Sequence, residues 1–316
     1  MNSIPSVFNQ RVISRSVIGG HEKCPNIRMK AAVVLLNRQW SPSREKSLGI
    51  LLGEGFEEVI SVELNPDNYS IEDVSRRFPS VKFIIPLESV TDGDLVNICA
   101  SEVKAQYFLI LRDTLELQPN MLSPILFERL VKDEPYCVVP RLTLQGGVSF
   151  PIVFRPSSKK SQFEVESTAK VTDGGATLYP FDGIALFNRR KFVQLGGYDY
   201  TIENPYWQTL DLAFRSWLWG ESTRVSASFA AVYGSSRSEQ DISASQYSNR
   251  FFLKNLAPIF VRDHGELSRS AFFRFLPRSS CGFIEALSQF LDARSWVSKN
   301  RYRFRLDAVS LVEKWS

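Results

Sequence analysis

Short apolar runs alternate with helical patterns through the first third of the chain. The apolar runs cover residues 31–36, 58–64, 81–85 and 107–111. The first, AAVVLL, is apolar throughout, as in a parallel strand that is buried on both faces. Helical patterns at 43–52, 71–77 and 93–105 separate the runs. Because strands and helices alternate with short links, the pattern predicts a mostly parallel α/β sheet with right-handed crossovers and flanking helices.

The rest of the chain departs from this regular alternation. Residues 141–170 contain Gly146-Gly147 and a basic turn at Lys159-Lys160, which predicts a β-hairpin. Further elements are expected as helices at 121–132 and 242–256 and strands at 136–139 and 227–233. We therefore expect three parts: a loosely held polar lead-in at 1–28, an α/β domain at 29–262, and a helical C-terminal extension at 263–316.

Polar residues stand where the predicted parallel strands end. Asn37 follows the first strand, Glu63 lies at the end of the second, and Arg112 and Asp113 follow the fourth. In open α/β sheets, ligands bind beyond the carboxyl ends of the strands, so these residues are predicted to share one cleft. Neither a GxGxxG nor a GxxxxGK[ST] motif follows the first strand, which argues against a Rossmann dinucleotide site or a P-loop.

Composition excludes several other classes of protein. The 316 residues are 44% hydrophobic and 23% charged, with a net charge of +4, which is ordinary for a globular protein and does not indicate nucleic acid. No apolar run approaches the ~18 residues of a membrane span, and the N-terminus lacks a signal-peptide core. The four scattered cysteines predict reduced thiols and a cytoplasmic location. With two histidines, His-rich metal sites and most Ser-His-Asp triads are not expected.

The most informative stretch covers residues 177–225. A strand-length run at 183–187 leads to a short helical turn that Gly196-Gly197 ends, as glycines do where φ is positive. A helix follows at 207–218, with one apolar stripe that consists of Leu210, Phe214, Trp217 and Leu218. Asp211 and Arg215 are one turn apart on another side of this helix, so their charges are expected to meet.

This stretch resembles the acceptor-side segment of inverting GT-A glycosyltransferases of the family-two type. The shared pattern is a strand, "LGGYD", a loop, and a helix of the form D-L-x-x-R-x-x-x-x-G. The matching residues are Gly196, Gly197, Tyr198, Asp199, Asp211, Leu212, Arg215 and Gly220. Gln208 and Thr209 stand where the family has a Glu-Asp pair whose Asp is usually the catalytic base. The resemblance implies a GT-A-like fold and transfer of a sugar, with inversion, from a nucleotide diphosphate sugar to a hydroxyl acceptor.

On the donor side, the segment YFLILRDTLELQP resembles the family's strand and D-x-D passage. The family's motif holds Mg²⁺ or Mn²⁺ against the diphosphate, and hard cations prefer carboxylate and phosphate oxygens. Only Asp113 of the two aspartates is kept, so the resemblance implies that Asp113 is the metal ligand and that Arg112 contacts phosphate. The alternative is a local ion pair of these two residues in a turn at the end of the strand.

The resemblance also suggests residues for the nucleotide. It places Asn37 at the base, Glu63 at the ribose and Asp94 near the uracil. The alternatives are a loop-start asparagine for Asn37, a solvated strand-end charge for Glu63, and a helix-start charge for Asp94. The sequence leaves these alternatives open.

The acceptor side offers two candidates for the base. Asp211 would take the proton of the acceptor hydroxyl as that oxygen attacks the anomeric carbon, and Glu203 is its substitute. Asp182 and Trp207 are candidates for contact with the acceptor, which we expect to be a glycan, lipid-linked or protein hydroxyl. The alternatives are a structural pair of Asp211 with Arg215, a solvated loop charge for Glu203, and a turn residue for Asp182.

The departures from the family pattern keep a second class of function open: a catalytically silent GT-A-fold protein that binds nucleotide, sugar or a protein partner. A sugar nucleotidyltransferase is a third, but its glycine-rich N-terminal motif is missing. The basic C-terminal run, which consists of Arg294, Lys299, Arg301, Arg303 and Arg305, is expected either to contact an anionic membrane surface or to form a solvated helix face. No nucleic-acid partner is expected.

Overall fold

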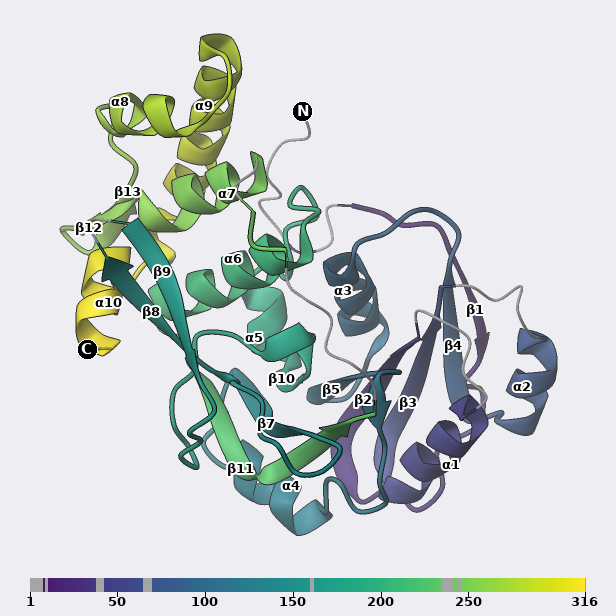
Figure 1. Ribbon diagram of the computed structural model, residues 1–316. Helices are drawn as coiled ribbons and strands as arrows, with labels where there is room; N and C mark the ends of the chain where they lie inside the picture. The colour runs from purple at the N-terminus through teal and green to yellow at the C-terminus, as the bar shows by residue number, and fades with distance from the viewer. Residues whose placement is uncertain are drawn as a thin grey trace.

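The computed structural model describes residues 8, 11–37, 43–64, 70–159, 162–234, 241–243 and 246–315. Its centre is a nine-stranded sheet in the order β1-β4-β3-β2-β5-β10-β7-β11-β6, flanked by helices (Figure 1). The strands of this sheet are β1 (Arg15–Gly19), β2 (Met29–Asn37), β3 (Phe56–Glu63), β4 (Val81–Pro86), β5 (Tyr107–Arg112), β6 (Leu115–Glu116), β7 (Cys137–Leu144), β10 (Ala185–Asn188) and β11 (Thr223–Tyr233).

The helices between these strands fall close to the predicted positions. They are α1 (Arg44–Glu54), α2 (Ile71–Arg77), α3 (Asp92–Glu102), α4 (Pro124–Val131), α5 (Arg189–Gln194), α6 (Pro205–Leu218) and α7 (Gln246–Phe251). Side-chain oxygens of Ser70, Thr91 and Ser123 accept hydrogen bonds from backbone N–H groups in the first turns of α2, α3 and α4. Such caps satisfy donors that a helix cannot satisfy internally, which fixes where each helix begins.

The mostly parallel sheet predicted from the sequence is confirmed. Strands β2, β3, β4 and β5 pair in parallel, and β7 and β11 run in the same direction on the far side of β10. Strands β1, β10 and β6 run the other way. All residues of β2 except Lys30 are buried, as its continuous apolar run predicts for a strand covered on both faces.

The prediction of a loosely held lead-in is wrong for part of residues 1–28. Strand β1 pairs antiparallel with β4 and forms an edge of the sheet. Arg15 on this strand forms an ion pair with Glu102 at 2.6 Å. The sequence did not indicate this strand, because its apolar content is low and its side chains are only half-buried apart from exposed Val17.

The predicted hairpin is confirmed as β8 (Val153–Lys159) and β9 (Gln162–Thr168), which pair antiparallel; Lys160 of its predicted basic turn lies outside the described residues. The aromatic ring of Phe163 on β9 packs edge-on against Phe214 of α6, with the ring centroids 5.4 Å apart. The hairpin therefore covers the helix that carries the family-like motif (Figure 1).

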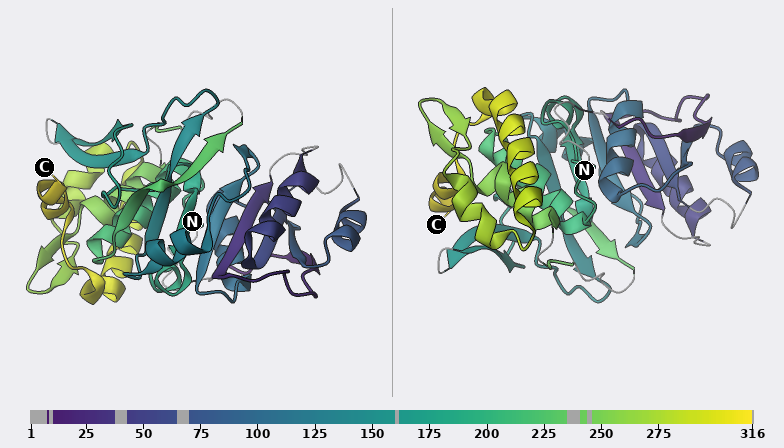
Figure 2. Two further views of the ribbon diagram at one scale, coloured as in Figure 1. Left: turned by 90° about the horizontal axis from the view of Figure 1, so that it is seen from below. Right: turned by 90° about the horizontal axis from the view of Figure 1, so that it is seen from above.

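The C-terminal extension is helical, as predicted, but begins with a small unpredicted sheet. Helix α7 continues as the π-helical turn η3 (Phe252–Leu256), and β12 (Ile259–Val261) pairs with β13 (His264–Glu266). The helical elements that follow are α8 (Ala271–Phe275), η4 (Leu276–Arg278), α9 (Phe283–Asn300), η5 (Arg301–Arg303) and α10 (Ala308–Trp315). This extension lies at the opposite end of the molecule from α1 and α2 (Figure 2).

Aromatic side chains attach the extension to α6. Trp219 stacks on Trp296 of α9 with ring centroids 5.9 Å apart, and Trp217 meets Trp315 of α10 at 4.5 Å. Such pairs are worth about 0.5–1.5 kcal/mol each beyond the area that they bury. Among the described residues, no helix is both long and apolar enough to cross a membrane.

Candidate functional site

Asn37, Glu63 and Asp113 lie at the carboxyl ends of three neighbouring strands. Asn37 and Glu63 are register partners at the ends of β2 and β3. The N–H group of Asp113, directly after β5, donates to the carbonyl oxygen of Leu36 on β2 at 3.2 Å. The predicted gathering of these residues at one edge of the sheet is therefore confirmed, while their roles stay predictions.

Glu63 is enclosed by polar partners. Its Oε1 accepts hydrogen bonds from Asn37 Nδ2 at 3.2 Å and from Ser61 Oγ at 2.7 Å, and its Oε2 pairs with Arg44. The Glu63 side chain is fully buried. This buried cluster holds α1 to the strand ends, so contact with a ribose would require it to open.

The sequence did not lead us to predict a role for Arg44, although its position in the chain indicates an ion pair. It occupies the first turn of α1, where the positive end of the helix dipole disfavours a cation. A basic residue in that position suggests a specific acidic partner. Glu63, 19 residues further along the chain, is that partner.

Arg112 is held by two aspartates at the end of β5. Its Nη2 donates to Asp92 Oδ2 at 2.8 Å, and its Nε donates to the carbonyl oxygen of Asp182 at 2.6 Å and lies 3.2 Å from Asp182 Oδ1. Burial lowers the pKa of Arg112, but the Asp92 and Asp182 carboxylates outweigh burial and raise it. The guanidinium therefore stays charged and forms ion pairs with Asp92 and Asp182, whereas the predicted alternative to phosphate contact was a pair with Asp113.

Asp182 joins the same cluster from another part of the chain. Its Oδ2 accepts a hydrogen bond from the hydroxyl of Tyr233, at the end of β11, at 2.9 Å. Burial and the Asp182 carboxylate raise the pKa of Tyr233, so this hydroxyl remains a donor at neutral pH. The backbone of Asp182 has a φ of 55°, a left-handed conformation that is unfavourable outside glycine and is enriched at functional sites.

Asp94 serves as a helix cap. It forms a capping box with Thr91 at the start of α3, and its Oδ2 lies 2.9 Å from Arg11 Nη1. Burial raises the pKa of Asp94, and the hydrogen bonds of the cap oppose that rise. The geometry thus favours the helix-start interpretation of Asp94 over a role at the nucleotide.

Few protein side chains on the donor side could bind a metal. Among the described residues, no three His, Cys, Asp or Glu side chains gather as a ligand set. Asp92 and Asp182 are committed to Arg112, whereas Asp113 is half-buried at the strand end. A single carboxylate is enough for Mg²⁺ or Mn²⁺ if substrate phosphates and water supply the other ligands. It is not enough for a site in which the protein supplies every ligand.

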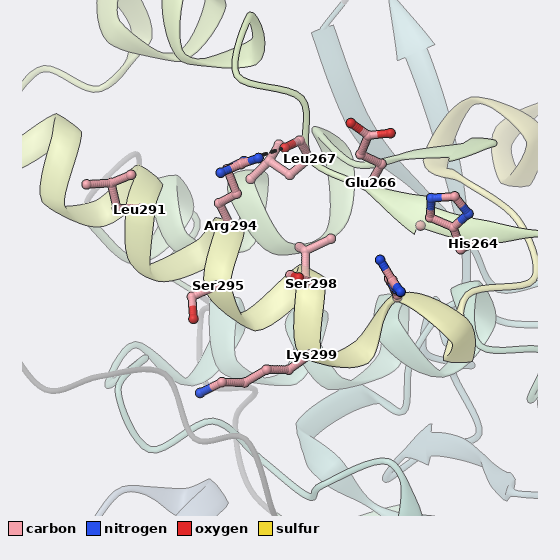
Figure 3. Close-up of a pocket in the computed structure, with 11 residues that line it drawn as sticks. His264, Glu266, Leu267, Leu291, Arg294, Ser295, Ser298 and Lys299 are labelled. Carbon is pink, nitrogen blue, oxygen red and sulfur yellow. Dashed lines mark hydrogen bonds between the residues drawn. The ribbon is translucent and has the colours of Figure 1, made fainter. Parts of the chain in front are cut away.

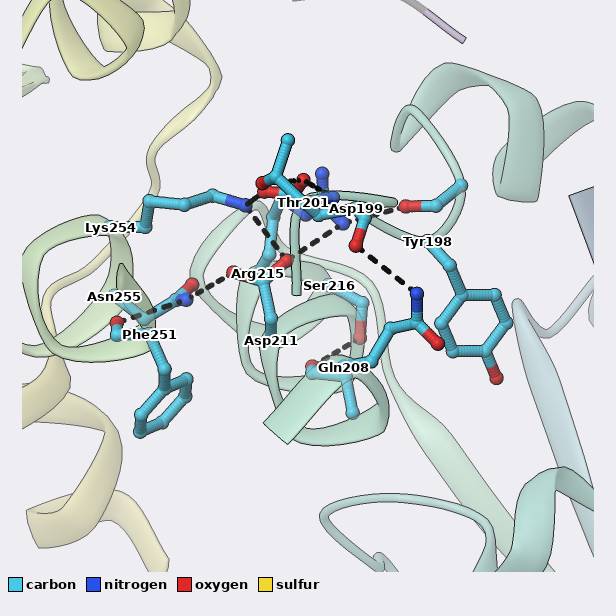
Figure 4. A network of polar contacts seen from close by, with 12 residues as sticks. Tyr198, Asp199, Thr201, Gln208, Asp211, Arg215, Ser216, Phe251, Lys254 and Asn255 are labelled. Atoms are coloured by element: carbon cyan, nitrogen blue, oxygen red, sulfur yellow. Dashed lines mark hydrogen bonds and ion pairs between the residues drawn. The ribbon is translucent and has the colours of Figure 1, made fainter. Parts of the chain in front are cut away.

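Asp211 lies in a closed ionic network (Figure 4). Lys254 Nζ is 2.7 Å from Asp199 Oδ2 and 2.9 Å from Asp211 Oδ2. Arg215 Nη2 is 3.2 Å from the same Asp211 oxygen, and Asn255 Nδ2 donates to Asp211 Oδ1 at 2.8 Å. The side chains of Asp199, Asp211 and Lys254 are 0% exposed. Burial raises the pKa of Asp199, but Lys254, Thr201 and Arg250 together outweigh burial and lower it.

The network argues against Asp211 as the base. A general base must reach the proton that it removes, and Asp211 would have to leave two cations and an amide to do so. The predicted pair with Arg215 is present, as the structural alternative requires. Lys254 and Asn255 were missed, although two polar residues inside the apolar run FFLKNLAPIF indicate buried polar groups that need partners.

Gln208, which replaces part of the family's Glu-Asp pair, connects α6 to α3. Its Oε1 accepts from the N–H group of Gly93 at 3.0 Å, and its Nε2 donates to Thr91 Oγ1 at 3.0 Å and to the carbonyl oxygen of Asp199 at 3.2 Å. A Cβ atom on Gly93 would lie only 2.5 Å from the Gln208 amide. This side chain is buried and fully hydrogen-bonded, so it is built into the fold.

Glu203 and Trp207 lie together at the start of α6. Glu203 is exposed, and its Oε2 accepts a hydrogen bond from the Tyr247 hydroxyl at 2.8 Å. It faces a cavity of 190 Å³ whose described lining residues are Tyr200, Thr201, Glu203, Gln246, Tyr247, Arg250 and Gln289. Trp207 Nε1 donates to the carbonyl oxygen of Ser243 at 2.9 Å. The lining of this cavity includes none of the strand-end residues.

A larger cavity of 680 Å³ lies in the C-terminal extension, between β13 and α9 (Figure 3). Its lining comes from residues 264–267 and 291–301, and none of the predicted site residues borders it. This hollow is therefore apart from the residues to which the family resemblance assigns chemistry.

Comparison with known proteins supports the fold. No protein-family profile matches the chain, and no curated protein matches it in sequence. The solved structure of GalNAc-T7 with UDP, GalNAc and Mn²⁺ matches 84% of this chain and 54% of its own, with a TM-score of 0.54 and 14% identity. TarS of S. aureus matches 87% of this chain and 54% of its own at 14% identity, with a TM-score of 0.46 on which we base no argument.

The chain thus spans about half the length of the structures that it matches. At 14% identity the likeness concerns the fold. The order of strands, their direction and this likeness together show that the chain has a GT-A-like fold.

Proposed function

We propose that the chain is a glycosyltransferase that moves a sugar, with inversion, from a nucleotide diphosphate sugar to a hydroxyl acceptor. The observation that carries the proposal is the position of Asp113: a half-buried carboxylate at the carboxyl end of β5 in a GT-A-like sheet, next to the strand end that carries Asn37. The matched GalNAc-T7 structure, which contains UDP, GalNAc and Mn²⁺, supports this class of donor.

Asp113 would hold the divalent ion, which neutralises charge on the leaving diphosphate when bound. The nucleotide would lie over the strand ends, where Asn37 and the Arg44–Glu63 pair form the floor. Arg112 stays with Asp92 and Asp182, and keeps the β5 end in a fixed geometry.

Glu203 is the better candidate for the base. It is an exposed carboxylate beside a small polar cavity, whereas Asp211 is enclosed. In the proposed reaction the acceptor oxygen bonds to the anomeric carbon, its proton passes to the Glu203 carboxylate, and the bond to the diphosphate breaks. Trp207 on α6 and Asp182, in the turn before β10, would contact the acceptor.

A donor panel tests the proposal. Thermal unfolding is measured with a series of nucleotide diphosphate sugars, each with and without Mn²⁺. A true donor at one hundred times its Kd raises the free energy of unfolding by roughly 3 kcal/mol. Asp113→Asn should abolish the Mn²⁺-dependent part of this rise, and Asp133→Asn, at an exposed aspartate after α4, is the matched control.

The proposal is wrong if no nucleotide sugar stabilises the chain, or if both variants respond to Mn²⁺ and donor as the parent does. A second function, a silent GT-A-fold protein that binds nucleotide, sugar or a protein partner, is favoured by the buried state of Gln208 and Asp211. Donor binding without release of nucleoside diphosphate, over glycan, lipid-linked and protein acceptors, would support that alternative.

A further inference from the structure

Exposed apolar side chains gather on α8 and α9. Phe273 is 76% exposed, Phe283 59%, Ile284 84% and Leu291 53%. The rings of Phe273 and Phe283 both contact that of Phe272, with centroids 5.9 Å and 5.7 Å away. The patch is thus continuous at the start of α9, and exposed apolar patches of this kind mark interaction surfaces.

One exposed stripe of α9 lacks the charges that a water-facing helix normally carries, while exposed Glu285 and Lys299 lie beside it. Helix residues are about 100° apart, so positions 284, 288, 291, 295 and 298 share one stripe. This stripe consists of Ile284, Ser288, Leu291, Ser295 and Ser298, all of them exposed. The inner face is apolar as well, with Ala286, Phe290, Ala293 and Val297 buried. Such a helix has a core-facing side and a second side that is suited to an apolar environment.

Positive charge is concentrated around this face. Residues 267–306 contain eight Lys and Arg against two Asp and Glu, whereas the rest of the chain contains 30 against 32. The two acidic residues are already engaged, since Glu285 accepts a hydrogen bond from Gln289 and Asp292 lies 3.6 Å from Arg250. Exposed arginines flank Phe273 along the chain, and they are Arg269, Arg274 and Arg278.

The cavity beside α9 adds further basic side chains to this surface, together with one carboxylate, Glu266. Figure 3 shows Leu291, Arg294 and Ser298 projecting from α9 on the side of the cavity. Arg294 donates to the carbonyl oxygen of Leu267 at 3.2 Å, and Arg301 also lines the hollow. Guanidinium and hydroxyl groups are donors that suit phosphate oxygens. Apolar side chains and phosphate-binding donors therefore follow one another along a single helix.

We propose that the outer surface of α8 and α9 binds peripherally to a bilayer that contains anionic lipid. Phe273, Phe283, Ile284 and Leu291 enter the boundary between headgroups and acyl chains, and the flanking arginines pair with lipid phosphates. Charge complementarity selects this partner, because the surface has cations at both ends and no acidic residue on the exposed stripe. The inference does not depend on the chemistry at the strand ends.

Co-sedimentation of the full chain with vesicles tests the proposal. We expect binding to phosphatidylcholine vesicles that contain phosphatidylglycerol, weak binding to phosphatidylcholine alone, and loss of binding in high salt. Phe273→Ser with Ile284→Ser should weaken binding at least tenfold by removing two apolar contacts. The matched control is Ile125→Ser on α4, where the parent side chain is 85% exposed.

A separate pair of variants tests the contribution of the arginines to vesicle binding. Arg274→Gln with Arg278→Gln should lower the partition coefficient by about 30-fold, from the usual contribution of each cation near an anionic surface. Arg141→Gln, at an exposed position on β7, should leave it unchanged. The thermal midpoint of each variant verifies folding.

Three outcomes overturn the proposal. They are no vesicle binding, equal binding to neutral and anionic vesicles, and equal effects of the α8–α9 variants and their controls. A dimer in sedimentation equilibrium that Phe273→Ser with Ile284→Ser dissociates would assign the patch to a second copy of the chain, and would overturn it too.

Discussion

Two regions of this molecule contain the carboxylates that the family resemblance assigns to chemistry, and they differ in how those groups are held. At the strand ends, Asp113 is half-buried beside Asn37. On the acceptor side, Asp199 and Asp211 are fully buried and shared with Lys254. Residues that match the family's motifs are therefore held differently in this chain: Asp113 is partly accessible, whereas Asp199 and Asp211 are enclosed by their partners.

The acceptor-side motif performs a structural task here. Asp199 follows α5, Asp211 lies on α6, and Lys254 belongs to η3, so one network connects α6 and the loop before it to the π-helical turn that precedes the C-terminal extension. Buried ion pairs gain little over apolar packing, but removal of one partner leaves an uncompensated charge. The residues of the family-like motif therefore fix η3 against α6.

The largest expected effect tests which carboxylate acts as base. Glu203→Gln should lower turnover by roughly 10²- to 10⁴-fold with donor affinity unchanged, because it removes proton transfer and leaves the fold intact. The measurement is release of nucleoside diphosphate from the donor that the panel identifies. Glu128→Gln, at an exposed position on α4, is the matched control.

Asp211→Asn completes this comparison. We expect it to lower stability while each folded molecule keeps its turnover, since the side chain does not reach the acceptor. If Asp211→Asn loses turnover at full stability and Glu203→Gln does not, the assignment of the two regions is reversed.

Lys254→Met gives the next largest effect. It leaves Asp199 and Asp211 buried with less compensation, and breaking a buried pair in this way costs about 3–5 kcal/mol of unfolding free energy. Urea unfolding measures the loss. The double variant that also contains Asp199→Asn should recover much of it, because Asp211 then keeps Arg215 as its counter-ion. A loss below about 1 kcal/mol in Lys254→Met would show that the network is not a closed unit.

Gly93→Ala tests the link between α3 and α6. A Cβ atom there would lie 2.5 Å from Gln208 and 2.6 Å from Tyr198, so we expect a loss of about 1–3 kcal/mol from overpacking. Gly49→Ala on α1 is the control, because its Cβ meets nothing within 4 Å and alanine is the better helix former. Equal stability of the two variants would contradict the role of Gln208.

The sequence predicted the local features of this fold well. The alternation of apolar runs located the four parallel strands, the turn residues located the hairpin, and the strand order brought Asn37, Glu63 and Asp113 to one edge. The Asp211–Arg215 pair, one helical turn apart, was also predicted. These features depend on periodicity and on neighbours in the chain, which a single sequence displays.

The contacts that were missed join distant parts of the chain. Lys254 is 55 residues from Asp199 and 43 from Asp211, and Gln208 is 115 residues from Gly93. Periodicity indicates that a side chain is buried without naming its partner. The distinction between a reactive and a structural Asp211 depends on these partners, so it required the three-dimensional structure.

The smallest effect concerns pH and compares two buried aspartates, Asp199 and Asp94. The pKa of Asp199 is lowered from the usual 3.8 because Lys254, Thr201 and Arg250 together outweigh burial, whereas burial raises the pKa of Asp94 above that value. Asp199 therefore contributes stability that is present above pH 3.8 and is lost as pH falls through its lowered folded pKa. Ionised Asp94 instead costs stability at neutral pH, and that cost disappears as pH falls through its raised folded pKa toward 3.8.

Urea unfolding at a series of pH values measures both contributions. The stability difference between the parent and Asp199→Asn should shrink on acidification below pH 3.8, because only the parent loses the ion pair. The stability difference between the parent and Asp94→Asn should grow as pH falls from neutral toward 3.8, because only the parent loses the cost of a buried charge. If these two stability differences change with pH in opposite directions, cationic partners, and not burial alone, make the acceptor-side carboxylates structural. If both change in the same direction, Asp199 and Asp94 do not differ in this way.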